Sequence, residues 1–578
     1  MTTTTTLNHY YEDELFRLRE LAVEFGRAHP LLAPMLGAPS GDPDVERLLE
    51  GVAFLTGLAR QKLDDGLPEL VQGLANLLFP HSLRPVPAAT LIAFEPRGAL
   101  RERAVVGAGT EIESTPVDGT ACRFRTCVDL DVEPIALADC RFVPSAGDLP
   151  ALRLDFEMLG IDASEWDATR IRLFVDGERL RASRLFALLM RHVVSVDITC
   201  GPPDRPGPRI ALGGGALRPA GFDDVLLPCP DRAFPGFRLL HEYFAFAEKF
   251  LFVELTGLER WRAARSGTQF SVWLTLDCAP DWLSCVDRDS FRLNVAAALN
   301  LFPHEAVPIQ HEHRATDYRL QPEGDARGHC RIFSVDRVVG YRPGHPGDRH
   351  YVPFGVAGDA ASYRLIRRTA LDGRRHNVHL ALAYPPGEAL ATETLSIDLS
   401  CTNGALPASL KIGDVCRPTD SSPECFAFAN ITPVSPSIDP PLGEPLLWRT
   451  IGLLALNFLS LGSADSLKQM LALHAFAEYR DDSRAQGDRR RIDGIESVDV
   501  QPETRIVGER MLNGQRVALR CRSDAFGGTG ELYLFGCVLE RFLSDYAAIN
   551  TYMRVEIDAS PDGERFAWPP RMGAQCLL

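Results

Sequence analysis

Seven large aromatic side chains lie between Phe234 and Leu255, and this density constrains the fold more than any other feature of the chain. The segment reads FPGFRLLHEYFAFAEKFLFVEL. Burying one large apolar side chain stabilises a fold by roughly 1.5–3 kcal/mol. The seven together therefore contribute about 10–20 kcal/mol gross, comparable with the net stability of a whole domain. We expect the segment to lie in a core or in a permanent protein interface.

The segment's own pattern predicts a short helix followed by a strand. Phe237, Leu240 and Phe244 are spaced for one face of a helix. Residues 250–255 read FLFVEL and are apolar on both faces for most of their length, which is typical of a strand covered on both sides.

The composition is that of a large folded protein whose main partners are not nucleic acids. At 578 residues, the chain is long enough for three or four domains. Its 45% hydrophobic and 24% charged residues are ordinary for a soluble globular protein. A net charge of −16 disfavours a phosphate backbone as the main partner. The fourteen cysteines never form a CxxC pair, so we expect buried thiols in a reducing compartment.

The same sequence predicts a cytoplasmic protein that does not insert into a membrane. The first ten residues, MTTTTTLNHY, have neither the basic nor the apolar region of a signal peptide. The most apolar helical run, residues 446–461, is too short to span a bilayer comfortably. Arg449 and Asn457 also interrupt it.

Changes of periodicity along the chain predict a multidomain α+β fold. Residues 1–84 read as a helical domain, and residues 85–220 as a first β-rich domain with period-two alternation. Residues 221–444 hold the aromatic segment and a second β-rich domain, and residues 445–578 form a C-terminal α+β domain. We expect both β-rich domains to be sandwich-like or barrel-like.

Finer assignments follow from turn and cap residues. Residues 201–221 are rich in proline and glycine and read as a connector. Residues 464–479 read as a helix that Ser463 caps. Residues 481–493 read as a charged loop, and residues 531–535 as a strand.

The N-terminal region reads as three helices with more apolar surface than one stripe each. Their ends are indicated by His29-Pro30, by the run Asp64-Asp65-Gly66 and by Phe79-Pro80. The pattern equally favours a bundle shared with a partner and a self-contained three-helix core. A helix near the C-terminus carries a further apolar stripe. The candidate interface residues are Leu15, Leu18, Phe25, Leu48, Val52, Leu70, Leu74, Leu78, Phe542 and Tyr546.

Three histidines are the main candidates for metal chemistry. His311 and His313 are two residues apart, so on a strand they share a face and could bind one cation. His304 could add a third nitrogen. This cluster supports an alternative hypothesis, a metal-dependent hydrolase. We favour it less, because no cysteine or carboxylate partner recurs at a ligand spacing, and because no GxxxxGK[ST], GxSxG or HExxH motif is present.

A histidine and a glutamate lie side by side within the aromatic segment. His241 and Glu242 could act as a general acid–base couple, or as a hydrogen-bonded pair beside a dense core. We favour the structural role, because no nucleophile, cofactor motif or substrate pocket is indicated nearby. We therefore expect no catalytic residue, no cofactor and no metal in this protein.

Long stretches of the chain resemble the TssF (ImpG/VasA) family of type VI secretion baseplate subunits. Residues 8–15 match NxYYxxEL, and residues 42–55 match DPDVERLLEGxAFL. Residues 74–87 match LxxLLxPHxLRPxP, and residues 300–320 match NLFPxxAxPIxxxHxxxxYRL. The aromatic segment and the ending WPPRMGAQCLL are similar to the family as well. The resemblance spans nearly the whole chain.

The resemblance implies a structural role in a contractile injection machine. A TssF subunit of such a machine is expected to be a wedge component without catalysis, with two TssF copies for each TssG. TssK and TssE join these wedges around the VgrG spike, and the ring of wedges receives the first sheath ring. Self-association of TssF fits this arrangement. The protein would be cytoplasmic and docked to the inner membrane only through the assembled machine.

Overall fold

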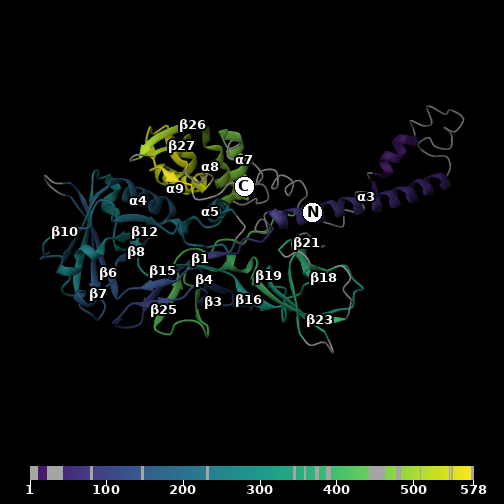
Figure 1. The fold of residues 1–578 in the computed structure, drawn as a ribbon, viewed down its shortest axis with the longest axis horizontal. Coiled ribbons are helices and arrows are strands. Elements are labelled where there is room, and N and C mark those ends of the chain that lie inside the picture. The colour runs from purple at the N-terminus through teal and green to yellow at the C-terminus, as the bar shows by residue number, and fades with distance from the viewer. Residues whose placement is uncertain are drawn as a thin grey trace.

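The computed structural model describes most of the chain. The described residues are 11–12, 14–22, 43–78, 83–144, 149–229, 234–342, 347–356, 360–370, 376–385, 392–440, 442, 462–476, 483–507, 510–545, 547 and 551–573. Figure 1 shows a body of several sheets and a long helix, α3 (Pro43–Leu78), that projects away from it. The fold is a mixed α+β fold with barrel-like sheets, as expected.

A six-stranded sheet in the body joins strands that are far apart in the sequence. Its order is β24 (Val415–Pro418), β3 (Glu111–Ser114), β4 (Arg123–Thr126), β15 (Val295–Leu299), β1 (Ala89–Pro96) and β25 (Phe426–Asn430). β1 pairs antiparallel with both β15 and β25. Strand pairing therefore crosses the expected boundary at residue 220, and residues 85–220 do not form a separate sheet domain. Periodicity identifies strands but does not identify their partners.

Two further sheets share one large hydrophobic core with the aromatic segment. The five-stranded sheet has the order β10 (Ile210–Ala211), β9 (Val193–Cys200), β13 (Gln269–Leu276), β7 (Ala151–Met158) and β6 (Ile135–Val143). The four-stranded sheet has the order β11 (Leu217–Ala220), β12 (Phe252–Thr256), β8 (Arg170–Val175) and β14 (Phe291–Arg292). The expected connector at residues 201–221 thus contributes the short strands β10 and β11.

Residues 302–402 form an eight-stranded sheet with a core of its own. The strand order is β16 (Phe302–Glu305), β23 (Glu393–Thr402), β19 (Arg331–Tyr341), β20 (Arg349–Pro353), β21 (Ser362–Thr369), β22 (His376–Ala383) and β18 (Tyr318–Arg319), with β17 (Ile309–His311) also on β23. Val338, Leu380, Leu395 and Ile397 are buried at its centre. Figure 1 places this sheet beside the inner end of α3.

In the C-terminal region, a buried helix packs on a five-stranded sheet. The elements of this region are α7 (Ala464–His474), α8 (Ser483–Asp493), β26 (Ile495–Val507), β27 (Arg510–Arg522), α9 (Thr529–Asp545), β28 (Thr551–Ser560), β29 (Arg565–Ala567) and β30 (Arg571–Met572). α9 connects β27 to β28, which pair in parallel. It also packs on α4 (Arg179–His192) and α5 (Pro235–Ala245), and so ties the C-terminal region to the body.

The structure corrects two assignments in this region and confirms a third. Residues 531–535 lie in α9 rather than in a strand, because a helix buried on nearly all sides is apolar throughout and loses its sequence period. Residues 483–493 form α8 rather than a loop, and only Ala485, Asp488 and Ile492 on it are buried. Ser463 caps α7 as predicted, since its side chain accepts a hydrogen bond from the Ser466 amide.

The aromatic segment forms α5, a short 3-10 turn and β12, as its pattern predicts. Phe237, Leu240 and Phe244 are all buried on α5. The ring centroid of Phe237 lies 6.1 Å from that of Phe542 on α9. Phe252 on β12 lies 5.1 Å from Phe174 on β8. The segment therefore forms the core between α9 and the four-stranded sheet.

Residues 43–78 form one helix, where the sequence predicts two. The helix continues through Asp64-Asp65-Gly66 and through Pro68. An internal proline removes one backbone hydrogen bond, but the flanking turns are rich in leucine and alanine, which are strong helix formers. We attribute the continuous helix to that propensity. Its consequence is a single long arm in place of a compact bundle (Figure 1).

Gly530 allows the close crossing of α9 and α4. A Cβ atom at this position would lie 2.7 Å from the backbone N and Cα of Arg184. Because helix backbone cannot yield as a flexible side chain can, we expect Gly530→Ala to lower the free energy of unfolding by about 1–3 kcal/mol. Gly51 on α3 has no atom within 4 Å of its Cβ position. Gly51→Ala is the matched control, and it should stabilise slightly; equal urea midpoints for the two variants would contradict this account of the crossing.

Candidate protein-interaction surfaces

The inner end of α3 is fixed to the eight-stranded sheet by amide side chains. Gln72 Nε2 donates to the Arg367 carbonyl at 2.8 Å, and its Oε1 accepts from the Arg367 amide at 3.0 Å. Asn76 Nδ2 donates to the Leu365 carbonyl at 3.3 Å. These bonds reproduce the pairing that a neighbouring strand would give to the edge of β21. They attach the arm through hydrogen bonds between amide side chains of α3 and the backbone of β21.

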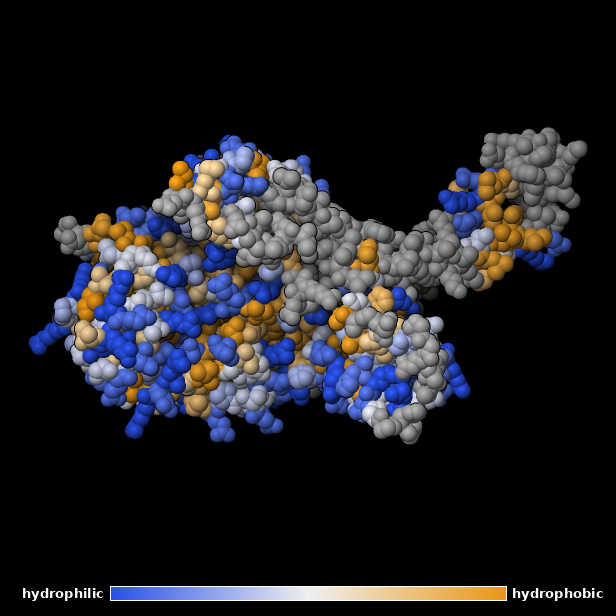
Figure 2. All heavy atoms as spheres, viewed as in Figure 1, coloured by the Kyte–Doolittle hydropathy of each residue, from blue (hydrophilic) through white to orange (hydrophobic). Residues whose placement is uncertain are grey.

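The outer part of α3 exposes large apolar side chains to solvent. Leu48 is 68% exposed and Leu55 is 66% exposed, and Val52 and Phe54 between them are exposed as well. Leu48, Val52 and Leu55 are spaced four and three residues apart, so they share one helix face. Figure 2 shows this part of the arm as a hydrophobic patch. We call the side chains of Leu48, Val52 and Leu55 the arm face.

The short helix at residues 14–22 lies against the outer part of α3. An ion pair joins Arg19 to Glu46 on α3. Leu15 is 8% exposed and Leu18 is half-buried, whereas Phe16 and Leu21 are exposed. The short helix is thus joined to α3 by an ion pair, and apolar side chains of both helices remain exposed. Such an exposed cluster on a projecting element is typical of a protein-binding surface.

The ten candidate interface residues fall into four groups. Leu48, Val52 and Leu74 are exposed on α3, while on the short helix Leu15 is buried and Leu18 is half-buried. Phe542 is fully buried in the core against Phe237, so it is not available to a partner and we remove it from the set. Phe25, Tyr546 and the side chains of Leu70 and Leu78 lie outside the described residues.

Glu242 is held by a buried lysine rather than by His241. Its carboxylate accepts hydrogen bonds from the Leu226 and Leu227 amides, each at 2.9 Å, and from Lys249 Nζ. Lys249 also donates to the Asp224 carbonyl at 2.6 Å. Both side chains are at most 1% exposed. The pair therefore clamps α5 to the loop before it, which is a structural role of the kind that we favour over acid–base catalysis.

His241 takes part in a cluster of rings instead. Its ring centroid lies 4.5 Å from that of His474 and 5.1 Å from that of Phe476. These contacts join α5 to α7 at the edge of the C-terminal region. The sequence offers one signal for the true partner of Glu242. The chain has only four lysines, and one of them, Lys249, falls inside the aromatic segment.

The three histidines of the metal hypothesis do not converge. His304 Nε2 is 2.8 Å from the Glu323 carbonyl, and His311 Nδ1 is 2.9 Å from the Tyr318 hydroxyl. The rings of His311 and His313 do meet, with centroids 4.1 Å apart. Burial, followed by the charge of His313, holds the pKa of His311 below its usual value. In the described part of the chain these histidines are not a group with three ligand atoms within 4.8 Å, so the hydrolase hypothesis has no support.

A different group of side chains has its ligand atoms close together. His192, Asp277 and Cys278 place one such atom each within 4.8 Å of the others. His192 Nδ1 lies 2.7 Å from Asp277 Oδ1, at the junction of α4 and β13. His192 and Cys278 are half-buried, and Asp277 is exposed. An exposed histidine–aspartate hydrogen bond of this kind needs no ion to explain it.

Asp545 gives the fold a pH dependence with a definite sign. Burial raises the pKa of Asp545 to about 6, against the opposing charges of Arg571, Arg238 and Arg541 and with the support of Glu540. In the unfolded chain, the Asp545 carboxyl has a pKa near 4. Between about pH 4 and pH 6 the folded protein therefore binds one more proton at this carboxyl than the unfolded chain does. The stability from that proton is complete below pH 4 and is lost as the pH rises through 6.

We therefore expect Asp545→Asn to stabilise the protein at neutral pH. The expected gain is about 1–3 kcal/mol at pH 7.5, and it should shrink at pH 4.5, where the native carboxyl is largely protonated. Urea unfolding at the two pH values measures the difference. Asp493→Asn, an exposed change at the end of α8, is the control. A gain of equal size at both pH values would show that ionisation of Asp545 is not its cause.

No helix within the described ranges is long and apolar enough to cross a membrane.

The exposed apolar arm face, on a helix that projects from a body of several sheets, is typical of proteins that assemble with other proteins. The chain belongs to the type VI secretion system TssF family, whose model matches residues 3–575. It is 29% identical to the type VI secretion system component TssF1 of Pseudomonas aeruginosa, over 98% of this chain and 99% of that protein.

Two solved structures are similar to this chain over nearly their whole length. One is a chain of the type VI secretion system TssK-TssF-TssG baseplate subcomplex, with a TM-score of 0.79 and 30% identity, over 92% of this chain and 99% of that chain. The other is a chain of the type VI secretion baseplate complex, with a TM-score of 0.63 and 27% identity, over 98% of this chain and 100% of that chain.

Proposed function

We propose that this protein is a structural wedge subunit of a type VI secretion baseplate and that it acts without catalysis. The observation that carries the proposal is the arm face, an apolar surface on a projecting helix that the chain itself leaves in water. Membership of the TssF family across residues 3–575 supports the same role. The subunit would set the spacing of the assembly with its sheets and hold partners with its arm.

The proposed partners are the TssG and TssK homologues of the same secretion system, with two copies of this chain for each TssG. Similarity to the chain of a TssK-TssF-TssG subcomplex supports the first two partners. We extend the proposal to TssE, to the VgrG spike and to the first sheath ring, which a baseplate must contact to fire. The assembly would form in the cytoplasm and would reach the inner membrane through its other components.

We propose that partner binding uses Leu48, Val52 and Leu74 of α3. It also uses the short helix at residues 14–22, which carries Leu15 and Leu18. Phe25, Leu70, Leu78 and Tyr546 stay in the proposed set on sequence grounds. Burying each large apolar side chain contributes roughly 1.5–3 kcal/mol, so three or four of them contribute about 5–12 kcal/mol gross towards a subunit contact, before the cost of association. A helix of a partner laid along the arm face is the arrangement that buries them with the least rearrangement.

Co-expression tests the proposal. We expect the full chain to co-purify with the TssG and TssK homologues of its own system, and native mass spectrometry should give two copies of it per TssG. The matched control is a co-expression without TssG, in which the chain should be recovered in lower yield or as aggregates, since its arm face is uncovered. A stable monomer that binds neither homologue would overturn the proposal.

A further inference from the structure

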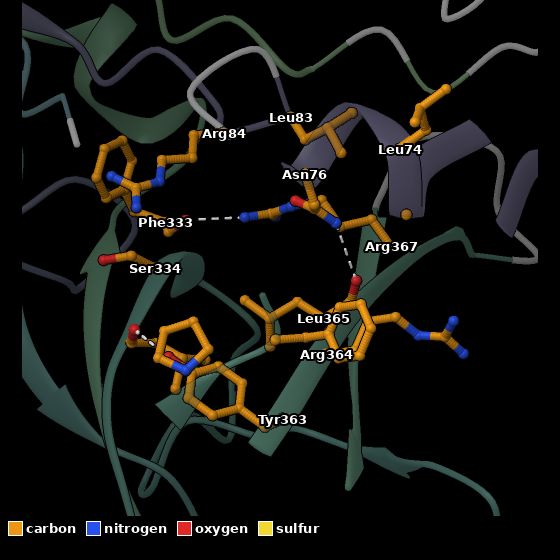
Figure 3. A pocket seen from close by; sticks show the side chains of 14 residues that line it. Leu74, Asn76, Leu83, Arg84, Phe333, Ser334, Tyr363, Arg364, Leu365 and Arg367 are labelled. Atoms are coloured by element: carbon orange, nitrogen blue, oxygen red, sulfur yellow. Dashed lines mark hydrogen bonds between the residues drawn. The ribbon is translucent and has the colours of Figure 1, made fainter. Parts of the chain in front are cut away.

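A cavity lies where the inner end of α3 meets the eight-stranded sheet (Figure 3). Its volume is about 390 Å³, within the range of sites that hold a ligand. Leu74 and Leu83 form one wall, and Phe333, Leu365 and Phe354 form the other. These walls are apolar, and 40% of Leu74 and 56% of Phe354 are exposed, so the cavity is open to a partner. It sits directly beside the amide contacts that attach the arm.

The charged side chains of the cavity are all cations. Arg84, Arg364 and Arg367 line it, and no aspartate or glutamate is among its described lining residues. Arg367 is committed to the fold, because it donates to the Ile332 carbonyl at 3.2 Å and to the Phe333 carbonyl at 2.8 Å. Arg364 is exposed and extends away from the other lining residues in Figure 3. The remaining cation is Arg84, which has no such hydrogen bonds to backbone carbonyls among the described residues.

Among the described residues, no carboxylate forms an ion pair with the half-buried guanidinium of Arg84; burial lowers the pKa of Arg84, and the more distant charge of Asp336 opposes that shift. The guanidinium carbon of Arg84 lies 5.4 Å from the ring centroid of Phe333. Within the described residues, no ion pair or side-chain hydrogen bond is made by it. Arginine keeps its charge in proteins and offers five N–H donors in a fork that fits a carboxylate. A carboxylate that entered beside Phe333 would therefore recover hydrogen bonds that the free protein lacks.

We propose that this cavity receives an apolar side chain from a partner subunit, on a segment whose neighbouring aspartate or glutamate pairs with Arg84. The proposal rests on the proposed function, because it needs an assembly partner. Charge complementarity selects the occupant, since the described lining of the cavity joins apolar side chains to a cation and includes no aspartate or glutamate. Leu74 links the cavity to the same helix as the arm face. An occupant would contact both α3 and β21, and would thus fix the angle of the arm on the body.

A photo-crosslinking amino acid at Phe354 tests the occupant directly. The full-length variant is co-expressed with the TssG and TssK homologues, irradiated, and digested for mass spectrometry. We expect cross-links to a partner peptide that has an acidic residue within a few positions of a large apolar one. Cross-links confined to this chain, in a complex that has assembled, would overturn the proposal.

Substitution of Arg84 tests the charge. Arg84→Gln should weaken binding of that partner roughly 10- to 100-fold, the usual effect of losing a charge-assisted hydrogen bond. Arg417→Gln, a change at an exposed arginine on β24, is the matched control and should leave affinity unchanged. Should folding suffer, Arg84→Glu combined with an acid-to-arginine change at the cross-linked partner residue should restore binding. Affinity within twofold of the unsubstituted protein for Arg84→Gln, or no rescue by the paired reversal, would overturn the cavity's role.

The two proposals fail in different ways. Loss of assembly on substitution of the arm face, with normal assembly of Arg84→Gln, would leave the wedge function standing and would remove only the cavity's role. Failure of the unsubstituted chain to bind either homologue would remove the wedge function itself. Co-purification of the unsubstituted chain is therefore measured first.

Discussion

Replacing Leu48 and Leu55 together by aspartate is expected to abolish incorporation of the protein into the baseplate assembly. The two side chains are 68% and 66% exposed in the free chain, so the variant should fold, with a free energy of unfolding within about 1 kcal/mol of the unsubstituted protein. In the assembly, each substitution would remove the roughly 1.5–3 kcal/mol of binding free energy that burial of the leucine side chain contributes. The affinity for the partner should therefore fall about 10²- to 10⁴-fold.

The control for this variant lowers the net charge by the same two units at two exposed positions that flank the arm face on the same helix. Arg47 and Thr56 are exposed on α3, next in sequence to the substituted residues. Arg47→Gln with Thr56→Asp should leave co-purification with the TssG and TssK homologues close to normal. Normal assembly of the leucine variant would show that the arm face has another purpose. Equal losses in both variants would point to added negative charge rather than to lost burial.

Replacing Lys249 by methionine is expected to destabilise the fold by about 3–5 kcal/mol, the cost of leaving one partner of a buried ion pair uncompensated. Glu242 and Lys249 are both almost completely buried. The Glu242 carboxylate also accepts hydrogen bonds from the backbone amides of Leu226 and Leu227. Without Lys249, the carboxylate would keep hydrogen bonds from these two amides and a longer ion pair with Arg238, whose Nε lies 3.8 Å from Glu242 Oε1, but would lose its fully buried countercharge. Urea unfolding, monitored by tryptophan fluorescence, measures the change.

A double variant separates the charge from the packing. Lys249→Met with Glu242→Gln removes both charges and retains an acceptor for the two amides, so it should recover most of the lost stability. Lys411→Met, at an exposed lysine, is the control and should change stability by less than about 0.5 kcal/mol. A double variant as unstable as the single one would indicate that lost packing, rather than the unpaired carboxylate, causes the effect.

Much of the fold is readable from the residues because burial leaves a strong pattern. The spacing of Phe237, Leu240 and Phe244 predicts α5, and the two-sided apolar run after it predicts β12. The same logic fails for α9, whose burial on nearly all sides removes the helical period. Sheet order fails as well, because β1 pairs with β15 and β25 across some two hundred residues or more, and alternation says nothing about partners.

The candidate surfaces were predictable in kind but not in detail. The surplus of leucine on the N-terminal helices indicates a surface to be covered, but which side chains remain exposed depends on how α3 leaves the body. Phe542 follows the same stripe pattern and is nevertheless core, since α5 covers it. The cavity beside Arg84 had no sequence signal. It arises only because Gln72 and Asn76 bring α3 against β21.

Hydrogen–deuterium exchange of the α3 amides at residues 48–55, in the free chain and in its complex with the TssG and TssK homologues, tests the central claim most directly. The claim is that the arm face exists to be covered by a partner subunit. We predict that exchange of these amides slows about tenfold or more on assembly, since a packed helix opens less often than an exposed one. Unchanged exchange at these residues in a complex that has demonstrably assembled would contradict the claim.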